Sequence, residues 1–147
     1  MIMDELNEFA DAENAFADGA TVLVGDVVDL GAGGTGFLGK QMYLVLQVTT
    51  DFAGGTSVNF QLASDAAAAI ATDGSASEHF ETGAIPIATL VEGYTIVVPV
   101  PPRGGVNEFE RYLGILAVNA GTNTAGAINA FLTMDPTLWK SYADGAN

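Results

Sequence analysis

Few side chains in this sequence could carry out chemistry. It contains no Cys, one His (His79), four Lys and Arg residues together, and eighteen Asp and Glu residues. A serine triad needs a His that contacts both a nucleophile and an acid, and no Ser lies in a G-x-S-x-G elbow. A metal-dependent oxygenase site needs several His ligands, which a single His cannot supply. We therefore expect a protein that is not an enzyme, with no cofactor and no metal.

Two overlapping glycine motifs resemble phosphate-binding loops. Residues 31–36 match G-x-G-x-x-G, and residues 34–40 match G-x-x-x-x-G-K. Both motifs hold phosphate only when a helix follows, because the amides of its first turn bind the anion. Here residues 42–48 alternate and are rich in β-formers, and Gln41 lacks the hydroxyl that would coordinate Mg²⁺. We interpret the segment as a loop between two strands.

Paired carboxylates occur at Glu108 and Glu110. At this spacing they share one face of a strand, whereas Arg111 points to the other face. A glycosidase needs two acids about 5–9.5 Å apart across a cleft, and neighbours on one strand do not define a cleft. We interpret the two acids as a solvated strand edge that charge protects from aggregation. We expect Arg111 to form a structural ion pair with a nearby carboxylate.

The charge balance excludes several classes of partner. The formal net charge is −14, and the four basic residues, Lys40, Arg103, Arg111 and Lys140, cannot form a basic face. Binding to nucleic acid depends on such a face, so we expect no direct contact with nucleic acid or with an anionic membrane surface. The longest apolar runs fall far short of the ~20 residues that a membrane helix requires.

Residues 1–19 differ from the rest of the chain. They carry six acids and no base, and they include Leu6, Phe9 and Phe16. The spacing of Leu6 and Phe9 fits one face of a helix, whereas Phe16 fits a helix or an extended arm equally well. We predict an N-terminal arm, extended or partly helical, that can become ordered on a partner.

From residue 20 onwards, apolar and polar residues alternate as they do in β-strands. We predict one domain over residues 20–147, because a chain of this length fits a single core. Turns rich in Gly, Pro, Asn and Asp separate the segments, and strands at such regular spacing indicate a sandwich or a barrel. Residues 64–72 are predicted to form a short helical turn capped by Ser64 or Asp65. The predicted strands are 21–30, 41–50, 57–63, 78–82, 94–100, 109–119 and 125–133.

A succession of short segments keeps one order along most of the chain. The segments are F-A-D-A at 9–12, V-D-L-G at 28–31, G-A-I-P at 83–86 followed by Leu90 and Gly93, V-P-V-P-P at 98–102, R-Y-L at 111–113, and T-A-G at 124–126 leading into A-F-L at 130–132. In this order they resemble the jelly-roll capsid cement, or decoration, proteins of tailed bacteriophages. The glycine-rich 31–40 loop and the tail from residue 133 depart from the family's pattern.

This resemblance implies a fold and a partner. The fold is an all-β, antiparallel jelly-roll β-sandwich of about eight strands. The alternation of the predicted strands suits such a sandwich, and from it we expect Val58, Phe60, Leu62, Tyr112 and Ile128 in the core. The protein would form a homodimer or homotrimer on the outer surface of the virion, where it would bind the major capsid protein and stabilise the shell by bridging its subunits.

The residues expected to contact the capsid or another copy of the chain are Leu6, Phe9 and Phe16 in the arm and Trp139 and Tyr142 in the tail. The arm's Phe residues have a second interpretation, in which they cover the edge of their own sandwich. The tail's aromatic residues could likewise fold back onto the sandwich. The competing function is a receptor- or carbohydrate-binding jelly-roll module of a virion. In that case Tyr43, Phe52, Tyr94 or Trp139 would stack on the ligand.

Overall fold

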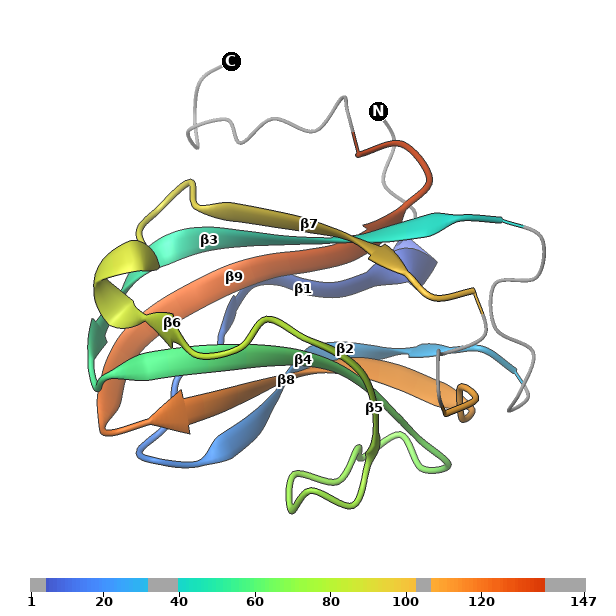
Figure 1. Ribbon diagram of the computed structural model, residues 1–147, viewed down its shortest axis with the longest axis horizontal. Helices are drawn as coiled ribbons and strands as arrows, with labels where there is room; N and C mark the ends of the chain where they lie inside the picture. Colours follow the sequence, from blue (N-terminus) through green and yellow to red (C-terminus); the bar gives the residue numbers. More distant parts are fainter. Residues whose placement is uncertain (1–4, 32–39, 103–106, 137–147) are drawn as a thin grey trace.

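The protein folds into two antiparallel β-sheets that lie face to face (Figure 1). The computed structural model describes residues 5–31, 40–102 and 107–136. The first sheet has the order β1-β9-β3-β7, formed by Glu8–Asn14, Asn123–Thr133, Met42–Gly54 and Thr95–Val100. The second sheet has the order β2-β8-β4-β5, formed by Thr21–Asp29, Tyr112–Ala120, Ser57–Asp65 and Ser77–Glu81. The short strand β6 (Ile85–Pro86) also pairs with β4.

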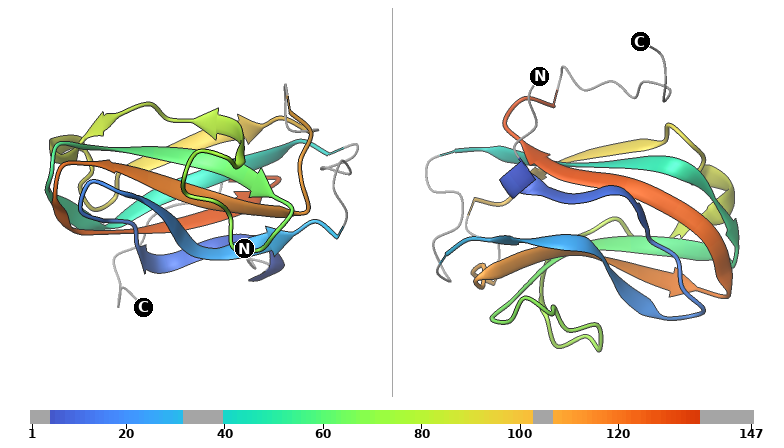
Figure 2. Two further views of the ribbon diagram at one scale, coloured as in Figure 1. Left: turned by 90° about the horizontal axis from the view of Figure 1, so that it is seen from below. Right: turned by 180° about the vertical axis from the view of Figure 1, so that it is seen from behind.

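The all-β sandwich predicted from the alternating pattern is confirmed. Each of the seven predicted strands overlaps an observed one, and β1 and β6 are additional. Two short 3-10 helices, η1 (Glu5–Asn7) and η2 (Ile87–Thr89), lie beside the strands. Seen from behind, the two sheets form separate layers (Figure 2), and residues of both sheets form one buried apolar cluster.

Alternate residues of each strand face this core. In β4, Val58, Phe60 and Leu62 are each at most 1% exposed, and in β9 Ile128 is equally buried. Full burial of one such side chain contributes about 1.5–3 kcal/mol. These four residues confirm the predicted core, because the period of two brings them to the same side of their strands.

Tyr112 was also predicted in the core, and that prediction is wrong. The inward residues of β8 are Leu113 and Ile115, which are fully buried, so the residue before them points outward. Tyr112 is half-buried instead, and the guanidinium of Arg111 lies 4.9 Å from its ring centroid. One residue of register therefore moves this side chain to the other face.

The predicted helical turn at 64–72 is wrong. Ser64 lies within β4, and the chain that follows bends without forming a helix. The carboxylate of Asp65 accepts hydrogen bonds from the amides of Ala67 and Ala71, both at 3.1 Å. An Asp side chain that binds nearby amides in this way competes with helix formation. A run of four alanines is also too short to nucleate a helix.

The N-terminal segment is a strand of the sandwich. Residues 8–14 form β1, which pairs with β9 from Glu8↔Phe131 to Asn14↔Ala127. The strand also packs on β2, where Gly25 has a φ of 62° and a Cβ added to it would collide with the backbone carbonyl of Phe9. The predicted boundary at residue 19 therefore does not separate an arm from the body of the domain.

Candidate functional site

The predicted contact residues of the N-terminal segment lie in three different environments. Phe9 is 1% exposed within the core, Phe16 is half-buried, and Leu6 is 79% exposed. The prediction that Phe9 contacts a partner is wrong, because the pairing of β1 with β9 turns its side chain between the two sheets. The second interpretation, in which it covers its own sandwich, applies to Phe9. Trp139 and Tyr142 lie outside the described residues.

A row of apolar side chains lies on the outer side of the first sheet. Pairing places Phe131, Val45 and Val97 in one cross-strand row. The inward residues of these strands alternate with them, so the row faces away from the core. Phe131 and Val45 are buried, whereas Val97 is 44% exposed.

Two exposed apolar side chains flank this row. Leu6 lies two residues before Glu8, the partner of Phe131, and Met134 directly follows the last residue of β9. Met134 is 62% exposed. The start of β1 and the end of β9 lie side by side at one end of the sheet (Figures 1 and 2). We call Leu6, Val97 and Met134 the apolar face. Contiguous exposed apolar patches are typical of protein-binding surfaces, and these three residues are the exposed large apolar side chains on the strands of this sheet and at their ends.

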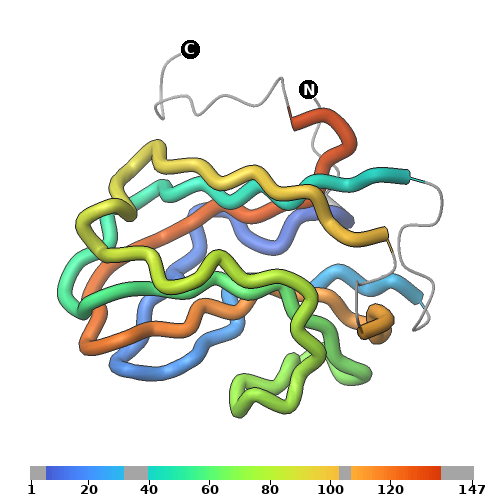
Figure 3. Tube along the Cα trace, in the orientation of Figure 1, coloured from blue at the N-terminus to red at the C-terminus, as the bar shows by residue number. Residues whose placement is uncertain are grey.

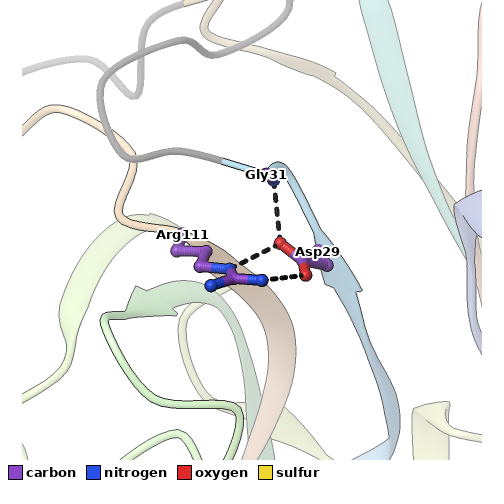
Figure 4. Close-up of polar contacts among 3 residues, drawn as sticks. All are labelled: Asp29, Gly31 and Arg111. Atoms are coloured by element: carbon purple, nitrogen blue, oxygen red, sulfur yellow. Dashed lines mark hydrogen bonds and ion pairs between the residues drawn. The ribbon is translucent and has the colours of Figure 1, made fainter.

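Arg111, the residue before β8, forms an ion pair with Asp29, the last residue of β2 (Figure 4). Its Nε and Nη2 donate to the two carboxylate oxygens at 3.0 and 2.9 Å, and the amide of Gly31 donates to Oδ1 at 2.8 Å. The Arg111 hydrogen bonds, followed by that of Gly31, hold the pKa of Asp29 below its ordinary value. Both side chains are about half exposed, so the pair fixes local geometry and adds little stability. It anchors the start of the glycine-rich loop.

The acids at 108 and 110 do not form the predicted strand edge. Residues 108–110 precede β8, and Phe109 between the two acids is 2% exposed. A carboxylate oxygen of Glu110 accepts a hydrogen bond from Ser77 Oγ at 2.8 Å, and its amide donates to Ser64 Oγ at 2.9 Å. Glu110 therefore fastens this segment to β4 and β5.

A contact between Ser64 and His79 was not anticipated from the sequence. Ser64 Oγ and His79 Nε2 lie 2.7 Å apart, and the His79 ring contacts that of Phe109 at 4.5 Å between centroids. Alternation with a period of two indicates which residues of a strand share one face. It does not indicate that β4 and β5 are neighbours, so the contact could not be predicted. Ser64 is fully buried, so a substrate cannot reach its hydroxyl. The contact is part of the packing.

Of the aromatic residues proposed for ligand stacking, Phe52 is buried, and Trp139 lies outside the described residues. Phe52 is 5% exposed and packs edge-on against Phe60, with ring centroids 6.0 Å apart. Tyr43 and Tyr94 are half-buried. The prediction that Phe52 stacks on a ligand is therefore wrong. Among the described residues, no group of three or more acidic or His side chains is placed to hold a metal ion. No helix in the described part of the chain is long and apolar enough to cross a membrane.

The chain matches a known protein family over most of its length. The family model described as Bbp16 matches residues 10–132. The matched segment begins within β1 and ends within β9, so it includes strands of both sheets. A search among curated proteins gave no match.

Proposed function

Because this chain belongs to the Bbp16 family, a phage-associated family, we propose that it is a cement protein of a phage head. In this role it binds the outer surface of the capsid and stabilises the shell by joining neighbouring major capsid subunits. The observation that carries the proposal is the family match over residues 10–132. Nearly the same stretch of the chain contains the succession of short sequence segments that resembles cement proteins.

The strand order supports the jelly-roll form of the sandwich that the resemblance implies. Counting the eight longer strands along the chain, the first sheet has the order 1-8-3-6 and the second has the order 2-7-4-5. Such an order arises when a long antiparallel hairpin is wrapped across two sheets, and jelly rolls contain eight strands in two Greek keys. A rigid body of this kind holds a contact surface in one fixed geometry.

The apolar face is the part of the surface that we assign to the capsid contact. Leu6, Val97 and Met134 are three of the four large apolar side chains that are strongly exposed among the described residues. Burying such side chains against a partner supplies about 25 cal/mol per Å² of apolar area. The net charge of −14 keeps the dispersed protein soluble and lowers non-specific association.

The proposed mechanism is mass action. A protein that binds the assembled shell, and does not bind dispersed capsid subunits, lowers the free energy of the assembled state only. Binding as a homodimer or homotrimer strengthens this effect, because the second contact forms at a high effective concentration. No reactive group is needed, which agrees with the burial of Ser64.

A cosedimentation assay with empty shells that lack the protein tests the contact. The variant Leu6→Asn/Val97→Thr/Met134→Gln retains side-chain size while removing the apolar surface. We expect binding to weaken by about tenfold or more, since a loss of about 1.4 kcal/mol summed over the three contacts is enough for a tenfold change. The matched control is Val91→Thr, because Val91 is 47% exposed and lies outside the apolar face. Equal binding by the triple variant, the control and the natural chain would exclude this contact surface.

A further inference from the structure

The outer side of the second sheet carries a cavity that is separate from the apolar face. Its volume is about 330 Å³. The floor consists of outward-facing residues of β4 and β8, namely Ala63, Leu116 and Val118. Residues 71–74 and 76 form one wall. The loop that carries them projects beyond the second sheet, below β4 in the tube drawing (Figure 3).

Packing holds this loop in place over the sheet. Ile70 is 4% exposed and packs with Ala63 and Leu116 in a small apolar cluster of its own. At the start of the loop, the carboxylate of Asp65 binds the amides of Ala67 and Ala71. The wall of the cavity is therefore anchored at two points.

Two carboxylates line the cavity above its apolar floor. Asp73 Oδ1 accepts hydrogen bonds from the amide and the hydroxyl of Ser75, at 3.0 and 2.6 Å, and these bonds lower its pKa. Glu78 Oε2 accepts a hydrogen bond from Gln61 Nε2 at 2.9 Å. Burial, and then the negative charge of Glu81, raise the pKa of Glu78. The described residues that line the cavity include no Lys or Arg.

The chemistry of the lining selects the type of ligand. An anion would be repelled by Asp73 and Glu78, and a sugar would find no aromatic ring among the lining residues to stack on. A long basic side chain fits both the apolar floor and the two carboxylates of the cavity. Its methylene stem packs on apolar groups while its charged end reaches polar groups. A guanidinium can also donate several hydrogen bonds to fixed carboxylates.

We propose that this cavity receives an arginine side chain of a partner protein, with the stem on Leu116 and Val118 and the guanidinium at Asp73 and Glu78. The inference rests on the proposed function, because the major capsid protein is the partner that would present the side chain. It adds a second, polar contact on the sheet opposite the apolar face, which would allow one copy to bridge two neighbours.

The direct test is an NMR titration of the full chain with N-acetyl-arginine methylamide at millimolar concentrations. We expect saturable shifts of the Leu116 and Val118 methyl signals and of the Ala76 amide signal. The citrulline analogue has the same shape without the charge, and we expect it to cause no saturable shift. This comparison needs no variant, so it does not depend on how well a variant folds. Absence of saturable shifts with the arginine compound, or equal shifts with the citrulline compound, would overturn the inference.

Variants locate the site. Asp73→Asn/Glu78→Gln keeps an oxygen acceptor for Ser75 and for Gln61 while removing both charges, and we expect arginine binding to weaken about tenfold or more. The matched control is Asp51→Asn/Glu92→Gln. Its two exposed residues are joined by a hydrogen bond from the Glu92 amide to Asp51 and lie outside the cavity. The control is expected to bind like the natural chain. Equal weakening in both double variants would show that net charge alone is responsible.

Cosedimentation with empty shells separates this inference from the proposed function. Failure of the natural chain to sediment would contradict the proposed function. If the natural chain sediments and Asp73→Asn/Glu78→Gln sediments equally well, the cavity takes no part in capsid binding and this inference alone fails. Weaker sedimentation of that variant, beside unchanged sedimentation of the control, is the result that we expect.

Discussion

Replacing Phe9 with Ala distinguishes a strand that belongs to the core from an arm that waits for a partner. The side chain is 1% exposed and packs between β1 and the second sheet. Removing a buried Phe side chain costs about 3–5 kcal/mol, through lost burial and the cavity left behind. A domain of this size has a total stability of about 5–15 kcal/mol. Phe9→Ala should therefore remove a large part of the free energy of unfolding.

Chemical denaturation followed by circular dichroism measures this loss directly. We also expect the thermal midpoint to fall by roughly 10–15 °C. The matched control is Phe16→Ala, because Phe16 is half-buried in the same segment and its loss should cost about 1 kcal/mol. An unchanged unfolding midpoint for Phe9→Ala would refute the placement of this side chain in the core.

Two further predictions concern the edges of the second sheet. Gly25→Ala should destabilise the protein by about 1–3 kcal/mol in a denaturant titration, because a Cβ there would collide with the Phe9 carbonyl at a positive φ. Gly83 also has a positive φ, but a Cβ added there meets no atom within 4 Å. A loss of stability in Gly83→Ala as large as that in Gly25→Ala would contradict the proposed collision. Arg111→Ala should raise the pKa of Asp29 towards its ordinary value of 3.8, as followed by the ¹³C signal of its carboxyl group. Because the pair lowers the folded-state pKa, its stabilisation is present above that ordinary value and is lost as the pH falls through the folded pKa; identical titration curves for the variant and the natural chain would argue against the pair.

The strands could be predicted well from the sequence. A strand that is buried on one face alternates apolar and polar residues with a period of two, and this alternation is visible in a short stretch of sequence. The side chains of β4 show this clearly, since Val58, Phe60 and Leu62 alternate with half-exposed residues. Tyr112 shows the limit of the method. In β8 both alternating sets of residues are largely apolar, so the pattern alone does not say whether the set with Tyr112 or the set with Leu113 and Ile115 faces the core.

The segment before residue 20 could not be placed from its own pattern. Its acids suggested an exposed arm, and β1 indeed has exposed residues from Asp11 to Asn14. What fixes the strand is β9, more than a hundred residues later in the chain, whose edge pairs with it. The cavity beside Asp73 and Glu78 escaped prediction for a similar reason, since β4, β5, β8 and the 66–76 loop meet only in the folded chain.

The most direct test of a stabilising role compares phage shells with and without this protein. We expect shells that lack it to break at a lower temperature or under milder osmotic shock. Adding the purified chain back should restore the resistance, because binding to the assembled shell alone favours that state. Shells that resist heat and osmotic shock equally well with and without the protein would contradict the proposal that it cements the capsid.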